Sequence, residues 1–464
     1  MAHKTRNISG ECSRRNFLKI GALGGAALAT VPHLASSEIP AFQDGSPPNI
    51  LFILTDQQGL DTISEMGCPY INTPNMDKLA RDGTAFMESH STNPLCSPAR
   101  SSMLTGRMPS ETTVIRNGLP IREDIPNLGQ WFGQHGYETV YAGKVHLPKS
   151  FPTSVPGFEL LPTGIGGHGN IGDAAISRAC EGYLRNRTGS DPFLLVASFL
   201  QPHDICQYQR MHRVNHEVPY PDIISELPPL PPNFNYDPLE PELVANIDRP
   251  AWTDLQWRYY LWSYYRHVEM VDAEIGRVLQ ALEDAGYTDN TLIIFTSDHG
   301  EGRARHQLVV KNYLYEEALK VPFLISWPGH IPEGKIDRTH LITGLDVIWT
   351  MCDYAGIASP GIGWGRSLKP LLDGYDVDWR PFLVSEVREI GRMVRTQNFK
   401  LITYEGDPVM QLFDMQNDPG ETVNLADDSE YDEMVSLHLY LLDTWEDGHE
   451  KPAKTAASQW QRYR

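Results

Sequence analysis

The stretch NPLCSPARSSMLTGR, residues 93–107, places a cysteine, a proline and an arginine at a spacing that suits chemistry on an anion. Pro98 fits the first turn of a helix, so Cys96 is expected at a helix N-terminus, where free amides and the helix dipole attract negative charge. Arg100 follows by four residues and is expected on the same face. A lone cysteine is more often a small buried hydrophobic residue, but that use needs neither neighbour.

Polar residues also follow four predicted strands at the point where each strand ends. Runs of mainly apolar residues predict these strands at 49–56, 138–142, 193–199 and 291–296. The polar residues at or beyond their ends are Asp56, Gln57, Lys144, His146, His203, Asp298 and His299. Asp and His at strand ends usually serve turns. However, ligands of an open α/β sheet bind outside the carboxyl ends of its strands, so four coinciding ends predict one site.

The donor types indicate a hard cation beside an oxyanion. Asp56, Gln57 and Asp298 offer oxygen ligands, which suit Ca²⁺ or Mg²⁺. Lys144 and Lys311 are cations, so they are poor metal ligands but good partners for a bound oxyanion. The sequence therefore predicts one metal ion, several positive side chains and a nucleophile.

The order of elements that must position these residues indicates an α/β fold with a large, mostly parallel central sheet flanked by helices. Helices are expected over 74–82, 125–134 and 257–282, and a further strand over 321–327. Prolines between residues 208 and 250 predict a long irregular excursion over the surface.

The last part of the chain has a different pattern. Strand-like runs at 382–385, 393–396, 400–404 and 411–414, and a helix near 431–446, predict a small C-terminal subdomain with an antiparallel sheet. We therefore expect a catalytic α/β domain over 38–375 and this subdomain over 376–464.

Residues 1–37 have the order basic, apolar, small, with Arg14-Arg15 ahead of a Gly/Ala-rich run. This order resembles a twin-arginine (Tat) signal peptide, and the apolar run is too short to span a membrane. No cysteine follows the run directly, so we expect no membrane anchor. The segment predicts export by the Tat machinery to a periplasmic or secreted location.

The formal net charge of the 464-residue chain is −20, which argues against a nucleic-acid or anionic-membrane partner. Any anion site must therefore create its own local positive field. The cysteines beyond the signal are Cys68, Cys96, Cys180, Cys206 and Cys352. They form no closely spaced pair and hence no zinc or redox motif, while disulfides among the four other than Cys96 remain open.

The motif Cys96-Ser97-Pro98-Ala99-Arg100, with Thr105-Gly106-Arg107 after it, resembles the signature of the type I sulfatases, which are relatives of alkaline phosphatase. Further blocks that resemble the family are residues 49–56, 143–146, 201–203, 297–300, 311–317 and 412–426. The resemblance implies oxidation of Cys96 to formylglycine by a maturation enzyme. It also implies Ca²⁺, with Mg²⁺ less favoured, held by Asp56, Gln57, residue 96, Asp298 and His299. Many members carry two acidic residues where this chain has Asp56-Gln57, so the cation would lose one counter-charge.

The resemblance also implies hydrolysis of a sulfate ester. One hydroxyl of the formylglycine hydrate would attack sulfur, and Arg100 would steady the hydrate. Lys144 and Lys311 would bind the sulfate, and His203, together with Lys311, would protonate the departing alcohol. His146 would then take a proton from the second hydroxyl, which expels sulfate. The substrate-binding residues would be Lys144, His203 and Lys311.

Several alternatives stay open at this level. Arg303, Arg305 and His306 are other cations near Lys311 that face the same region, and His168, His212 and His216 are either substrate contacts or solvated loop residues. A phosphonate monoester or phosphodiester hydrolase would share the nucleophile. A non-catalytic glycan-binding relative would tolerate loss of Cys96, Asp298 or His203. Export and the long excursion favour a sulfated carbohydrate as substrate, without indicating which sugar or which position.

Overall fold

The computed structural model describes residues 47–148, 153–163, 167–212, 221–235, 239–361 and 363–448. The predicted export signal, residues 1–37, and His216 lie outside the described residues.

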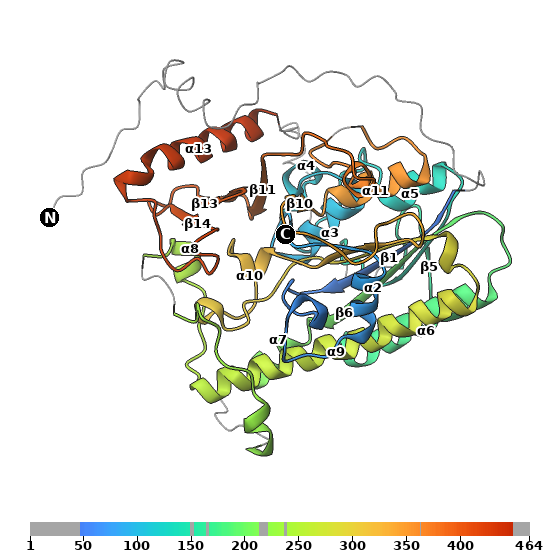
Figure 1. Ribbon diagram of the computed structural model, residues 1–464, viewed down its shortest axis with the longest axis horizontal. Helices are drawn as coiled ribbons and strands as arrows, with labels where there is room; N and C mark the ends of the chain where they lie inside the picture. Colours follow the sequence, from blue (N-terminus) through green and yellow to red (C-terminus); the bar gives the residue numbers. More distant parts are fainter. Residues whose placement is uncertain are drawn as a thin grey trace. The chain divides into compact units, whose positions relative to one another are not determined.

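The central sheet has eight strands, in the order β5-β4-β6-β1-β7-β8-β2-β9 (Figure 1). The strands are β1 (Asn49–Asp56), β2 (Thr84–Phe86), β4 (Glu138–Gly143), β5 (Glu159–Leu160), β6 (Phe193–Pro202), β7 (Thr291–Ser297), β8 (Phe323–Ser326) and β9 (Lys335–Asp337). The five strands from β5 to β7 are parallel, whereas β8 runs antiparallel to both of its neighbours. The predicted α/β class with a mostly parallel sheet is confirmed.

Strand β1 lies between β6 and β7, and all of its residues are buried. This burial explains the unbroken apolar run, because a central parallel strand has helices over both faces. Figure 1 shows α6 (Gly169–Asn186) and α9 (Asp254–Asp284) over one face and α3 (Cys96–Thr105), α5 (Leu128–Gln134) and α11 (Asp346–Ala355) over the other.

Helix α9 illustrates how the sequence sets the packing. Thr253 begins it with a capping box, since its hydroxyl accepts from the Gln256 amide and the Gln256 side chain accepts from the Thr253 amide. The predicted apolar stripe, Leu261, Tyr264, Val268, Val271, Ile275, Val278 and Leu282, is buried against the sheet and α2 (Pro74–Arg81).

The C-terminal sheet is antiparallel, in the order β11-β12-β13-β14. Its strands are β11 (Phe382–Val387), β12 (Gly391–Thr396), β13 (Phe399–Tyr404) and β14 (Gln411–Asp414). Helix α13 (Asp432–Asp447) packs on it through Val435, Leu442 and Trp445. The predicted small antiparallel sheet is confirmed, while the boundary between residues 375 and 376 stays a prediction.

The excursion after β6 differs from the expectation of irregular chain. It contains α7 (Ile205–His212), the 3₁₀ helix η2 (Pro221–Glu226) and α8 (Glu242–Ala245). Proline did not prevent these helices, because Pro221 is the first residue of η2 and Pro241 is the N-cap of α8. At these positions the missing N–H group costs no hydrogen bond within the helix. Helix α7 ends before the first proline of the segment.

Short elements complete the described chain. Strand β3 (Ser89–His90) pairs with β10 (Ile342–Thr343). The short helices are α4 (Pro109–Thr112), α10 (Glu316–Leu319), α12 (Lys369–Leu372), η1 (Ser64–Met66), η3 (Thr288–Asn290), η4 (Arg305–Gln307) and η5 (Ser429–Tyr431). In the described part of the chain, no helix combines the length and apolar character that crossing a bilayer requires. Cys68, Cys96, Cys180, Cys206 and Cys352 are free thiols, so the disulfides left open above do not form in this structure.

Candidate active site

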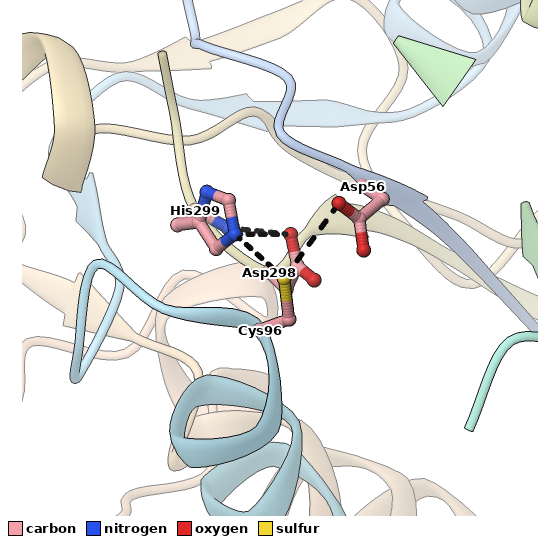
Figure 2. Close-up of side chains that lie close together, drawn as sticks. All are labelled: Asp56, Cys96, Asp298 and His299. Carbon is pink, nitrogen blue, oxygen red and sulfur yellow. Dashed lines mark hydrogen bonds and ion pairs between the residues drawn. The ribbon is translucent and has the colours of Figure 1, made fainter. Parts of the chain in front are cut away.

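The strand ends meet as predicted, and α3 brings Cys96 to the same place. Asp56 ends β1, Asp298 and His299 follow β7, and Cys96 begins α3. One ligand atom of each of these four residues lies within 4.8 Å of the others (Figure 2). Lys144 follows β4 and His203 follows β6, so every predicted strand contributes to one edge of the sheet.

Cys96 is buried, with 1% of its surface exposed. Its sulfur lies 3.2 Å from His299 Nε2, 3.8 Å from Asp56 Oδ1 and 3.8 Å from Lys144 Nζ. Burial and the Asp56 carboxylate oppose ionisation. The Lys144 and Lys311 ammonium groups outweigh them and hold the pKa of the Cys96 thiol well below its ordinary value. Residue 96 therefore sits in a local positive field, despite the strongly negative chain.

The start of α3 is fastened to two loops. The Ser97 amide donates to Asn117 Oδ1 over 3.0 Å, and the Ser97 hydroxyl donates to the His146 carbonyl over 2.6 Å. Sequence reasoning missed Asn117, because its contact with α3 depends on the path of the intervening chain rather than on a local motif.

Arg100 ties the strand ends together. Its Nε donates to Asp298 Oδ2 over 2.8 Å, and its Nη2 donates to Asp56 Oδ2 over 3.0 Å. Its Nη1 donates to the Lys144 carbonyl and to the Ser198 hydroxyl, over 2.7 and 2.8 Å. The guanidinium thus contacts residues from β1, β6 and the segments after β4 and β7, and it compensates two buried carboxylates. Its predicted contact with the hydrate stays a prediction.

The two lysines contact neighbouring residues at the end of β1. Lys144 Nζ is 2.5 Å from Asp56 Oδ2, and the negative charges of Asp56 and Cys96 raise its pKa against the effect of burial. Lys311 donates to Gln57 Oε1, and burial is again outweighed, here by the charges of Cys96, Cys206 and Asp56, so its pKa is also raised. Both ammonium groups are therefore charged and suited to bind an oxyanion.

Gln57 is engaged at every polar atom. Its amide donates to Asp298 Oδ1 over 3.0 Å, and its carbonyl accepts from the Tyr264 hydroxyl over 2.7 Å. Its side-chain oxygen accepts from Lys311, and its side-chain nitrogen donates to Glu301 Oε2. The predicted role of Gln57 as a metal ligand stays a prediction.

The two predicted proton-transfer residues are both half-buried. Burial and the nearby Lys311 ammonium lower the pKa of His203 to about 3, so its ring is neutral at neutral pH. His146 has a left-handed backbone, with φ of 61°, and its buried Nδ1 has no hydrogen-bond partner within the described chain.

The alternative cations are occupied elsewhere. Arg303 and Arg305 both form ion pairs with Asp61, and His306 Nδ1 lies 2.9 Å from Glu317 Oε1. Among these basic residues and Lys311, it is Lys311 that reaches Gln57. His168 lies 3.6 Å from Asp204, and the His212 ring stacks beside Tyr208, so neither placement by itself indicates a substrate contact.

The donor set fits a metal ion. His299 Nδ1 lies 2.8 Å from the Gly300 carbonyl, and a proton on Nδ1 donates a hydrogen bond to that oxygen. Burial opposes protonation of the ring, but the charges of Asp298 and Cys96 raise its pKa. In the neutral ring with its proton on Nδ1, Nε2 would present a lone pair toward Cys96 and Asp298 to a metal ion. Asp56 Oδ2 is taken by Arg100 and Lys144, whereas Oδ1 faces the Cys96 thiol. Two carboxylates and an imidazole at one point provide oxygen and nitrogen ligands for a divalent cation.

A second acid–histidine group lies against the C-terminal sheet. Glu88, His90 and Glu316 also place ligand atoms within 4.8 Å of one another. Here each carboxylate oxygen has a basic partner. Lys320 and Arg395 pair with Glu88, over 2.7 and 3.3 Å, and Lys400 and His90 pair with Glu316, over 3.0 and 3.3 Å. We call these six residues the paired cluster.

Comparison with known proteins agrees with this geometry. Residues 48–357 match the family model described as Sulfatase, and residues 304–445 match that of the N-sulphoglucosamine sulphohydrolase C-terminal region. A Δ4,5-hexuronate-2-O-sulfatase of Bacteroides thetaiotaomicron is 32% identical, with 87% of this chain and 90% of the relative covered.

Solved structures give the same result. A 2-O GAG sulfatase has a TM-score of 0.75 at 28% identity, covering 90% of this chain and 94% of that one. The phosphonate monoester hydrolase of Agrobacterium radiobacter shares the fold, with a TM-score of 0.73 at 24% identity and coverage of 86% and 95%. The family resemblance seen around residues 96–107 is confirmed, and sulfatases typically bind a metal. This chain belongs to the sulfatase family and is a sulfuric ester hydrolase.

Proposed function

We propose that this protein hydrolyses sulfate monoesters on a carbohydrate, with a formylglycine derived from Cys96 as the nucleophile. The observation that carries the proposal is the position of Cys96. It begins α3 beside two carboxylates and an imidazole, within the positive field of Lys144 and Lys311. A hydrate at this position offers one hydroxyl to attack sulfur and a second to expel the product.

We propose Ca²⁺ as the metal, held by Asp56, residue 96, Asp298 and His299, with Gln57 as a further oxygen ligand. The ion would supply positive charge that lowers the pKa of a hydroxyl and offsets charge on sulfate oxygens. The oxygen donors support a hard cation, and because Ca²⁺ and Mg²⁺ both take such ligands, Mg²⁺ is the alternative.

The protein side chains divide the remaining work. Lys144 and Lys311 bind the sulfate oxygens, and Arg100 holds the carboxylates of Asp56 and Asp298 in place. Burial is the main cause of the low pKa of His203, and the Lys311 charge is the second. A sulfate oxyanion beside Lys311 would offset that second contribution, so substrate binding raises the pKa of His203 and favours the protonated ring that donates to the leaving alcohol. His146 takes the proton that releases sulfate.

A carbohydrate substrate is supported by the relatives named above, since one acts on a 2-O-sulfated hexuronate and another is a GAG sulfatase. The excursion that follows His203 supports it further, because its helix α7 lies beside the site, where Cys206 contacts Gln57 and Gln209 contacts Glu301. In the alternative interpretation, the excursion covers the edge of the sheet and does not contact the substrate.

We also propose that residues 1–37 direct export through the Tat machinery to the periplasm or outside, after a maturation enzyme has acted on Cys96. Arg14-Arg15 and the apolar run behind it support this. A fusion of residues 1–37 to a reporter is expected to be exported, and Arg14→Lys/Arg15→Lys is expected to retain it in the cytoplasm.

The full-length protein, produced with a maturation enzyme, tests the chemistry. We expect peptide mass spectrometry to find formylglycine at residue 96, and turnover of 2-O-sulfated unsaturated hexuronates within a panel of sulfated sugars. Cys96→Ala is expected to abolish turnover, and undiminished desulfation by this variant would overturn the proposal. Faster turnover of phenylphosphonate esters than of p-nitrophenyl sulfate would favour a phosphonate hydrolase instead. An unmodified thiol in natively produced protein would favour a glycan-binding role.

A further inference from the structure

Glu301 lies behind the predicted site and is fully buried. One of its oxygens, Oε1, accepts from the Tyr260 hydroxyl, from Gln209 Nε2 over 3.0 Å and from the Val310 amide over 2.6 Å. The other, Oε2, accepts from Gln57 Nε2. The carboxylate therefore has one oxygen committed to the scaffold and one directed to Gln57.

The two neighbours of the Gln57 side chain determine how its amide is turned. Glu301 is an acceptor and requires the NH₂ group, whereas Lys311 is a donor and requires the oxygen. The two requirements agree, so the amide oxygen faces the Lys311 ammonium. Cys206 Sγ, 3.4 Å from Nε2, is compatible with the same orientation.

We propose that Glu301 is a positioning residue, which orients the Gln57 amide so that its oxygen faces Lys311 and the sulfate-binding region. Many sulfatases carry a second acidic residue directly after the one at position 56. Here Glu301 supplies a carboxylate that contacts the Gln57 side chain, one side chain further from the predicted metal site. Gln209 links this carboxylate to α7, so the excursion and the site share one hydrogen-bond network. The inference rests on the proposed function of Lys311 in binding sulfate.

The substitution Glu301→Gln makes a directional prediction. The three donors at Oε1 keep the new amide oxygen where it is, so the new NH₂ group faces the NH₂ group of Gln57. Gln57 must then turn, which presents hydrogen-bond donors to Lys311 instead of an acceptor. Loss of such a supporting partner lowers activity by about 10- to 100-fold, and we expect this decrease in kcat/KM on a sulfate ester.

The double variant Gln57→Glu/Glu301→Gln tests whether the orientation of the side chain at position 57 matters, and not only whether residues 57 and 301 are hydrogen-bonded. In this double variant the carboxylate at position 57 accepts from Lys311 with one oxygen and from the side-chain amide at position 301 with the other. The three scaffold donors keep their acceptor. We expect each single variant to lose activity and the double variant to regain most of it. If Glu301→Gln does not fold, the comparison of Gln57→Glu with the double variant decides.

A readout independent of turnover is the affinity for inorganic sulfate, measured by calorimetry. We expect weaker binding in both single variants and recovery in the double variant. Glu386→Gln is the matched control, since Glu386 on β11 of the C-terminal sheet is also buried but accepts from the Ser110 amide of α4, away from Gln57 and Lys311. It is expected to leave sulfate affinity and kcat/KM unchanged.

The outcomes separate the two proposals. Wild-type sulfate affinity and kcat/KM in Glu301→Gln, with only a lower thermal midpoint, would reduce Glu301 to a structural residue and overturn the inference. A double variant no better than the single variants would also overturn it. If the wild type turned over no sulfate ester, the proposed function would fail. The affinities of the variants for inorganic sulfate would still show whether Glu301 positions Gln57.

Discussion

The predicted site and the paired cluster have similar compositions but different electrostatics. Each brings acids and a histidine within 4.8 Å in the interior. In the paired cluster every carboxylate oxygen meets a basic group, so the charges cancel locally. In the site, Asp56 Oδ1 faces a thiol, and Lys144 and Lys311 have positive charge directed at Cys96.

The comparison shows that clustered ligand types do not by themselves define a metal or anion site. Arg100 and Lys144 pair with carboxylates of the site as well, but only through Oδ2 of Asp56 and Asp298, and Asp56 Oδ1 faces Cys96 instead of a basic group. The paired cluster joins the catalytic sheet to the C-terminal sheet, since Lys400 lies on β13 while Glu316 begins α10. The following predictions separate a cluster that maintains the fold from one that performs chemistry.

Lys400→Met should have the largest effect on stability. Lys400 is fully buried and pairs with both Glu316 and Glu421, over 3.0 and 2.7 Å. Removing one partner of a buried ion pair leaves uncompensated charge and costs about 3–5 kcal/mol. Denaturant unfolding measures this loss. Activity per folded molecule should be unchanged, and a selective loss of kcat would contradict the comparison.

Lys144→Ala should show the reverse pattern. Losing a group that stabilises developing negative charge lowers kcat by about 10²- to 10³-fold. Steady-state kinetics on the preferred sulfate ester measures the decrease. Lys144→Met also removes the charge but keeps most of the side-chain volume, so it serves as the control for side-chain packing; Arg100 still pairs with Asp56 in both variants. A variant that is less stable but keeps full activity per folded molecule would assign Lys144 a structural role, like that of Lys400.

Metal removal should act at one cluster alone. Binding of a ligand at a concentration about a hundredfold above its Kd stabilises the folded state by about 2.7 kcal/mol, so a chelator is expected to lower both activity and the thermal midpoint. Asp298→Asn should remove this response, whereas Glu88→Gln should keep it. Loss of the response in Glu88→Gln would assign the ion to the paired cluster.

The last prediction concerns the pH dependence of stability, which changes only gradually with each pH unit. Burial opposes protonation of His306, but Glu317 and Glu421 raise its pKa to about 9. Because the folded pKa exceeds the ordinary value of about 6.5, this contribution to stability is complete below about pH 6.5 and is lost as the pH rises through about 9. The slope is at most about 1.4 kcal/mol per pH unit. Unfolding measured across this interval should be flatter for His306→Gln.

The strands and their polar ends could be predicted because a central parallel strand needs an unbroken apolar run, as in residues 49–56. Short strands could not. Thr84–Phe86, which lies between β8 and the edge strand β9, has three residues, too few for a recognisable pattern, and pairs only through tertiary context. Lys311 was named from the family resemblance, but the residue pattern left Arg303 and Arg305 as alternatives, because excluding them depends on their ion pairs with the distant Asp61.

Glu301 shows the same limit at the site. It stands three residues after Asp298, where an acid in a polar loop is typical of solvated chain. Its burial follows from the phenol of α9 and the amide of α7 that close over it, and neither contact has a local signature. The nearby Asp298 was predictable because it directly follows an apolar strand.

The burial of Cys96 determines whether its modification can follow folding or must precede it. A side chain with 1% of its surface accessible cannot enter the catalytic pocket of another protein while α3 stays packed. If a maturation enzyme converts this thiol, as proposed above, it must therefore act before α3 folds against the sheet. A chain that folded first would keep an unmodified cysteine until it unfolded.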